Sequence, residues 1–157
     1  MATVIVNGQK KAQVREDLMC VITGAIKFAS RGDADMVKIT AEVAEAVGKT
    51  GLSDGTVTLF VPGATGALTT LEYEPGVVED VQKALDVVAP ADKFYRHNVN
   101  LGDGNGHSHV RAGLVGPSLT VPFVDGRLTL GRYQSIVFCD FDARPRERSI
   151  VVQVMGV

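Results

Sequence analysis

Hydrophobic residues recur along this chain with two spacings, one typical of strands and one typical of helices. Short β-branched and apolar runs bounded by Gly, Pro, Asn or Asp predict strands. They lie at 21–28, 36–39, 56–61, 119–123, 127–130, 134–141 and 149–155, and the run at 67–72 is either a strand or a buried segment. The Asp125-Gly126 step between two of these runs predicts a hairpin.

Two longer segments have the helical spacing. The first follows Thr40 and ends before Gly51, and the second begins at Pro75 and ends at Pro90. A shorter helix is predicted over 107–114, whereas residues 98–106 are rich in Asn, Gly and Asp and are expected to form a loop. Two main helices among many strands predict an α+β domain, with a β-rich mixed or antiparallel sheet or a sandwich.

The first eighteen residues differ in character from the rest of the chain. A short β-prone piece, a turn at Asn7-Gly8 and a polar, basic stretch precede the regular pattern. We therefore expect an N-terminal extension over residues 1–18 and one domain over residues 19–157, which is an ordinary length for a single hydrophobic core.

Composition excludes several classes of function. The formal net charge of −2 offers no attraction for nucleic acid, and no apolar run approaches the roughly 20 residues that span a bilayer. We expect a cytoplasmic protein with no membrane partner. Cys20 and Cys139 lack the paired spacing of a zinc motif, so both are expected to be reduced and mostly buried.

All three histidines of the chain, His97, His107 and His109, lie in one short stretch together with Asp103 and Asn105. Imidazoles that converge with a carboxylate are common ligands of zinc and similar ions. Residues two apart point to the same side of an extended segment but diverge by about 200° in a helix. The two later histidines therefore converge only if the helix begins at or after His109.

The same cluster has other interpretations. Histidines can perform acid–base chemistry or bind a phosphate together with Arg96 and Arg111, or they can simply cap backbone groups at a helix start. Elsewhere the small-residue segment 63–67 is either a turn or a place where a ligand approaches the backbone. Glu72 and Glu74 precede a helix, so a capping role is expected for this pair. The arginines at 144, 146 and 148 are expected to form a solvated hairpin tip, with contact to an anion or a partner as the alternative.

Several ordered motifs together resemble one known family. They are Tyr95-Arg96-His97-Asn98, the run from Asp103 to His109, Leu114 to Leu119, Val124 to Gly131, Gln134 and the closing Val151 to Gly156. From about residue 20 onward the chain is similar to the YjbQ-like family of secondary thiamine-phosphate synthases. The resemblance implies an α+β homotrimer with sites near subunit boundaries, and a weak transferase activity that joins a hydroxymethylpyrimidine pyrophosphate to a thiazole phosphate.

The resemblance also implies roles for particular residues. His97, His107 and His109 are expected to hold a divalent metal ion such as zinc or magnesium, and no organic cofactor is implied. The remaining site residues are expected to be Thr65, Glu72, Asp103, Asn105, Arg111 and Gln134, with Asp103 as base or orienting group and Arg111 meeting phosphate. Many members of the family have a His where this chain has Gly63. The alternatives are a metal-dependent hydrolase of a small phosphorylated or amide substrate, and a non-enzymatic trimer that binds a small ligand or metal.

Overall fold

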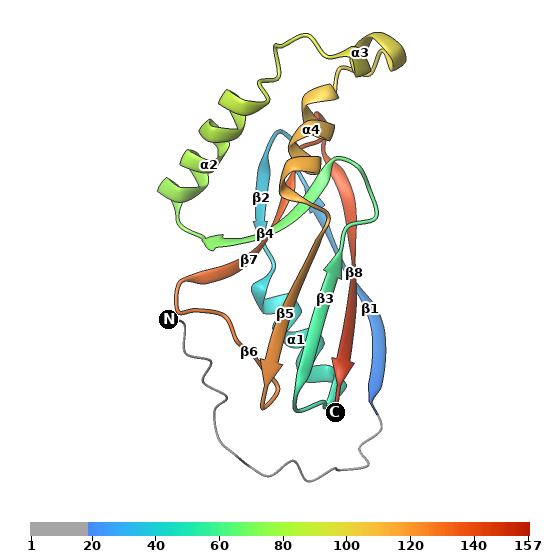
Figure 1. Cartoon of the computed structure of the whole chain (residues 1–157), viewed down its shortest axis with the longest axis vertical. Helices are drawn as coiled ribbons and strands as arrows, with labels where there is room; N and C mark the ends of the chain where they lie inside the picture. Colours follow the sequence, from blue (N-terminus) through green and yellow to red (C-terminus); the bar gives the residue numbers. More distant parts are fainter. Residues whose placement is uncertain (1–18) are drawn as a thin grey trace, which may run out of the picture.

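The computed structural model describes residues 19–157, so the predicted extension over residues 1–18 lies outside the described residues. Two antiparallel sheets and four helices make up the described part, as Figure 1 shows. The strands are β1 (Cys20–Ser30), β2 (Asp35–Lys38), β3 (Gly55–Phe60), β4 (Gly66–Glu72), β5 (Ser118–Val124), β6 (Arg127–Leu128), β7 (Gln134–Asp140) and β8 (Arg146–Gly156). The helices are α1 (Thr40–Thr50), α2 (Pro75–Val88), α3 (Arg96–Leu101) and α4 (Gly106–Val115).

The larger sheet has the strand order β1-β8-β3-β5-β6 and the smaller one the order β2-β7-β4. The expected α+β class is confirmed, and the segment at 67–72 is a strand. One prediction was wrong: the polar stretch expected to be a loop contains α3 over its first part. The Asn and Gly residues of this stretch have a low helix propensity, which is why the sequence pattern predicted no helix there. Gly102 ends α3 in the left-handed conformation that glycine tolerates, at φ 70°.

The main core lies between the two sheets and under α1. Strand β8 alternates between buried and more exposed positions, so that Ile150, Val152 and Val154 all point inward. They meet Val43 and Val47 of α1, and the core continues with residues of β3, β5 and the inner face of the smaller sheet. This alternation is the pattern of a sheet with only one covered face.

The smaller sheet, by contrast, is covered on both faces. Ile136 and Phe138 of β7 face the main core, whereas Val137 and Cys139 face a second cluster under α2 and α4. All residues of β7 after Gln134 are therefore buried, which explains the unbroken apolar run in the sequence. Burial raises the pKa of Cys139 to about 12, so this thiol is the inert hydrophobe that was expected. Cys20 is exposed, contrary to expectation.

Three connections between the sheets lie at the same end of the molecule. The chain passes from the larger to the smaller sheet between β1 and β2 and between β3 and β4, and it returns between β7 and β8. Helices α3 and α4 lie at this end, opposite the C-terminus (Figure 1). The histidine-containing segment is thus next to the turns that join the two sheets.

We predict that Gly66→Ala destabilises the protein, because an added Cβ would lie 2.8 Å from Cε2 and 2.9 Å from Cζ of Phe138. Phe138 is fully buried and packs edge-on against Phe28, so its ring has little room to move. Urea denaturation should show a loss of about 1–3 kcal/mol in the free energy of unfolding. The control is Gly48→Ala in α1, where the added Cβ meets nothing, and a gain of up to about 1 kcal/mol is expected. Equal stabilities for the two variants would contradict this packing.

Candidate functional site

His97, Asp103 and His109 converge at the junction of α3 and α4. His97 lies in the first turn of α3, His109 lies in the first turn of α4, and Asp103 comes from the loop between the two helices. The loop reverses through Gly102 and Gly104, both at φ 70°, a conformation that other residues rarely adopt. These two glycines bring the two helix starts and the carboxylate to one point.

The distances among these groups are short. Nε2 of His97 lies 3.2 Å from Oδ1 and 3.3 Å from Oδ2 of Asp103, and the rings of His97 and His109 have centroids 4.3 Å apart. One potential ligand atom from each of the three residues lies within 4.8 Å of the others. Two ligand atoms on a single Zn²⁺ lie about 2.8–3.6 Å apart, given bonds of about 2.0–2.2 Å. Small side-chain rotations therefore suffice to bring the three groups onto one cation.

The side-chain amide of Asn105 completes this cluster. One terminal atom of this amide, oxygen or nitrogen according to its orientation, faces the cluster. This atom lies 3.0 Å from Nε2 of His97, 3.2 Å from Nε2 of His109, and 3.0 and 3.2 Å from the carboxylate oxygens of Asp103. With nitrogen turned inward, the amide donates hydrogen bonds to these atoms, but its two hydrogens cannot serve all four. With oxygen turned inward, it adds a further ligand. Two imidazoles, a carboxylate and an amide oxygen fit a divalent cation such as Zn²⁺ or Mn²⁺.

The expected ligand His107 is not part of the cluster. Helix α4 begins at Gly106, before both histidines, so the divergence by about 200° applies and His107 points away from His109. Its side chain is 6% exposed, lies beside the ring of Tyr95, and has an Nδ1 without a hydrogen-bond partner. Burial, and after it the charge of Arg111, lower the pKa of His107. The expected triad of histidines is therefore replaced by two histidines and Asp103.

Arg111 was expected to meet phosphate, and the structure corrects this too. The guanidinium is 3% exposed, donates to the backbone oxygen of Ala89 at 2.9 Å, and pairs with Asp86 at 2.6 Å. Arg111 therefore anchors α4 to the end of α2. Arg96 precedes His97 on α3, is exposed, and makes no ion pair within residues 19–157, so it is a nearby cation that remains available to an anion.

Glu72 and Gln134 lie far from the cluster. They face each other at the last position of β4 and the first of β7, whereas Gly66, at the other end of β4, faces Asp140. Six residues of strand separate the two ends by about 20 Å. Gln134 donates to Oγ1 of Thr70 at 2.9 Å. Neither residue contributes to the wall expected opposite the histidines, while the neighbouring Glu74 caps α2, as predicted, by accepting from the backbone N–H groups of Gly76 and Val77.

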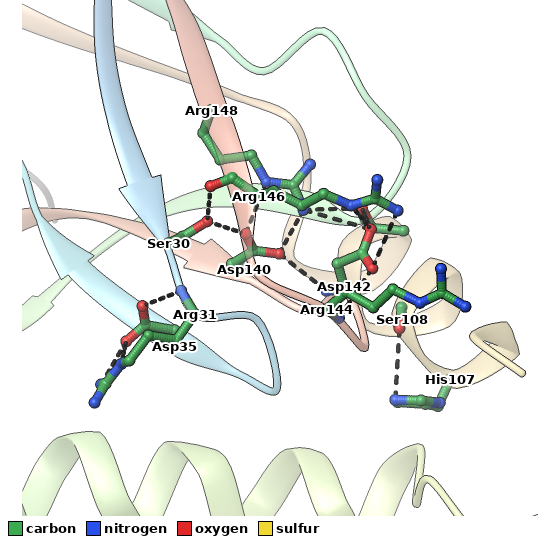
Figure 2. Close-up of polar contacts among 11 residues, drawn as sticks. Ser30, Arg31, Asp35, His107, Ser108, Asp140, Asp142, Arg144, Arg146 and Arg148 are labelled. Atoms are coloured by element: carbon green, nitrogen blue, oxygen red, sulfur yellow. Dashed lines mark hydrogen bonds and ion pairs between the residues drawn. The ribbon is translucent and has the colours of Figure 1, made fainter.

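Thr65 is held by a buried network of charges, most of which Figure 2 shows. Its hydroxyl donates to Asp142 at 3.2 Å and accepts from Arg148 at 3.1 Å, and its backbone oxygen accepts from the N–H of Phe141. Burial opposes the ionisation of Asp142, but hydrogen bonding and charge from Arg146, with hydrogen bonds from Thr65 and the backbone of Arg144, keep its pKa below the usual range. Thr65 is thus a structural residue that fixes the segment before β4.

Asp140 is the centre of the same network. It is fully buried and accepts from Ser30, from the backbone N–H of Asp142, and from two nitrogens of Arg148. Sequence reasoning missed both aspartates and placed Arg148 in a solvated tip, although its side chain is only 13% exposed. The residues that bind these aspartates are distant along the chain, and the aspartates themselves stand at the end of an apolar strand. No local sequence pattern therefore identified them.

The segment fixed by Thr65 faces His109, one member of the cluster, across a hollow of about 300 Å³. Gly63, Ala64 and Gly66 form one side of it, and His109 and Gly113 of α4 lie on another. Gly63, where many relatives were expected to have a His, is therefore near the candidate ligands. An added Cβ at Gly63 meets nothing within 4 Å, so the position is open.

Residues 24–157 match the model of the UPF0047 protein YjbQ-like family. The chain belongs to this family. It is 34% identical over 138 residues to a UPF0047 protein of Methanothermobacter thermautotrophicus, covering 88% of this chain and 94% of that protein. It is 35% identical over 124 residues to the UPF0047 protein YugU of Bacillus subtilis, covering 78% of this chain and 90% of YugU.

Solved structures of the YjbQ-like family have the same fold. A YbjQ-like protein of unknown function from Sulfolobus solfataricus superposes with a TM-score of 0.84 at 29% identity, covering 89% of this chain and all of that one. An uncharacterised YjbQ/UPF0047 protein from Clostridium acetobutylicum gives a TM-score of 0.74 at 34% identity, covering 82% of this chain and 98% of that one.

In residues 19–157 no helix is both long and apolar enough to cross a membrane.

We predict that His107 makes stability depend on pH. Its pKa is lowered by folding, so as pH falls below the unfolded value of about 6.5 the unfolded chain binds a proton that the folded one resists. The free energy of unfolding should fall on acidification, by at most about 1.4 kcal/mol per pH unit from this group. Urea denaturation between pH 8 and pH 5 should show a smaller loss for His107→Gln. Parallel pH profiles for the two proteins would contradict the assignment.

Proposed function

We propose that this YjbQ-like protein is a divalent-metal-dependent enzyme that acts on a small phosphorylated substrate. The leading reaction is that of a thiamine-phosphate synthase. In it the nitrogen of the thiazole phosphate forms a bond to the methylene carbon of the hydroxymethylpyrimidine, the bond from that carbon to pyrophosphate breaks, and pyrophosphate is released. The observation that supports it is the convergence of His97, Asp103 and His109, with the amide of Asn105 at hydrogen-bond distance from all three. A bound cation would supply neutralisation of the negative charge that develops on departing pyrophosphate.

The chain's own residues have separable roles in this proposal. His97, Asp103 and His109 hold the cation, and Asn105 turns its amide oxygen inward as a further ligand. Arg96, exposed and one residue from His97, contacts the outer phosphate oxygens. The hollow beside His109 receives the rest of the substrate.

We predict that His97→Ala, His109→Ala and Asp103→Ala each weaken binding of Zn²⁺ or Mn²⁺ by at least about 100-fold, because even groups that only support a metal ligand contribute 10–100-fold. Isothermal titration of the metal-free protein measures this directly. His107→Gln is the matched control, since its side chain lies outside the cluster, and it should retain wild-type affinity.

The reaction is tested separately on the metal-loaded protein. Hydroxymethylpyrimidine pyrophosphate and thiazole phosphate should yield thiamine phosphate, with product lost in the same three alanine variants. Pyrophosphate or phosphate released at the same rate without the thiazole acceptor would establish the hydrolase alternative instead. Metal bound tightly with no turnover of any phosphorylated substrate would favour a binding protein, and unchanged metal affinity in the alanine variants would refute the site.

We also propose that the protein forms a homo-oligomer, with a trimer as the expected state. The outer face of the larger sheet supports this. The strand register places Val21, Thr23 and Ala25 of β1 in rows with Met155, Gln153 and Val151 of β8. The rows continue through Thr56, Thr58 and Phe60 of β3 to Pro122, Thr120 and Ser118 of β5. None of these twelve side chains is charged, and those of Val21, Phe60 and Met155 are 57%, 45% and 42% exposed.

We predict that Thr58→Lys combined with Gln153→Lys dissociates the oligomer, because two like charges would be buried together at the centre of this face. Light scattering after size-exclusion chromatography should show the monomer mass. Val87→Lys on α2, where the side chain is 83% exposed, is the matched control and should leave the mass unchanged. An oligomer that persists in the double variant would show that subunits meet elsewhere.

A further inference from the structure

The hollow beside His109 has walls made of small residues. Its lining includes Gly63, Ala64, Gly66, His109, Gly113 and Pro117, and its volume is about 300 Å³. No side chain that lines it carries a fixed charge, and the imidazole of His109 is the one polar side chain among them. The hollow therefore suits the uncharged part of a ligand and is poorly suited to a second phosphate.

Gly113 keeps the hollow open. It follows His109 by four residues on α4, so the two positions share one face of the helix. A glycine inside a helix costs about 1 kcal/mol relative to alanine, and an added Cβ at Gly113 would meet nothing within 4 Å. Packing thus does not require glycine at this position, and a larger side chain there would point back over the turn of His109.

The opposite wall is held in place. Thr65 lies within the segment that carries Gly63, Ala64 and Gly66, and it is bound by Asp142 and Arg148. The Cβ of any residue replacing Gly66 would collide with Phe138, so this wall cannot thicken without disturbing the core. The width of the hollow is therefore defined by the fold and by the absence of side chains at Gly63 and Gly113.

We propose that this hollow is the subsite for a compact, uncharged ring of the substrate, and that Gly113 and Gly63 determine which rings fit. This inference rests on the proposed function, because the diphosphate attached to the ring would be held by the cation at His97, Asp103 and His109. A cavity of about 150 Å³ accommodates benzene, so a hollow of twice this volume takes one substituted ring. His109 belongs to both halves of the site, so ring and diphosphate lie next to each other.

The test uses two probes on the full chain loaded with Mn²⁺. Methyl diphosphate carries the anion alone, and 2-phenylethyl diphosphate adds a ring without an activated leaving group. Isothermal titration should show that the ring improves binding by at least tenfold in the wild-type protein. Gly113→Leu should abolish this gain, so that the two probes bind the loaded variant with equal affinity. Gly48→Leu, also at an open position in a helix but on α1, should keep the full gain.

Each outcome separates the subsite from the proposed function. If methyl diphosphate does not bind the loaded wild-type protein, the proposed function fails. If it binds but the ring adds nothing, or if Gly113→Leu keeps the gain, the subsite is refuted and the proposed function stands. Should Gly113→Leu fail to give a wild-type circular dichroism spectrum, Gly63→Leu fills the hollow from the opposite wall, where an added Cβ is also unobstructed, and the same criteria apply.

Discussion

The ion pairs between Asp140 and Asp142 at the end of β7 and Arg146 and Arg148 of β8 are the interaction on which the rest of this structure depends. The network ties three of the connections between the two sheets at this end, those between β1 and β2, β3 and β4, and β7 and β8. Ser30 joins from the first, Thr65 from the second, and the arginines from the third. A buried carboxylate without its partner costs about 3–5 kcal/mol, so the arrangement tolerates little change.

This network also determines the position of the candidate site, although none of its charged groups belongs to the metal cluster. Thr65 is hydrogen-bonded to Asp142 of this network, and this bond fixes the position of the segment at 63–66. That segment faces α4. On the other side, Arg111 holds α4 against the end of α2 through Asp86 and the backbone of Ala89. The site therefore lies between two supports, each of which contains an ion pair between an arginine and an aspartate.

Much of the fold and part of the site could be predicted from sequence. The helix starting at Pro75 and the apolar strand at 134–141 carry their signals locally, and the cluster of His97, Asp103, Asn105 and His109 is evident from proximity along the chain. The exchange of His107 for Asp103 depended on where the helix begins: convergence of His107 and His109 required a start at or after His109, and α4 starts three residues earlier, at Gly106. Sequence patterns locate such boundaries poorly. The roles of Arg111 and Asp140 depended on partners elsewhere in the sequence. The spacing of hydrophobic residues does not identify such partners. Glu72 and Gln134 were grouped with the site by resemblance, and only strand register separated them.

The donor groups of the candidate cluster all come from one short segment, residues 97–109. Closing so small a loop requires little loss of chain entropy, and the segment makes few contacts with the sheets apart from those of α4. The corner formed by α3 and the loop is therefore a unit of low local stability attached to a rigid base. A cation held there would order this corner alone, and its release would loosen α3 on the timescale of local opening while both sheets remain intact.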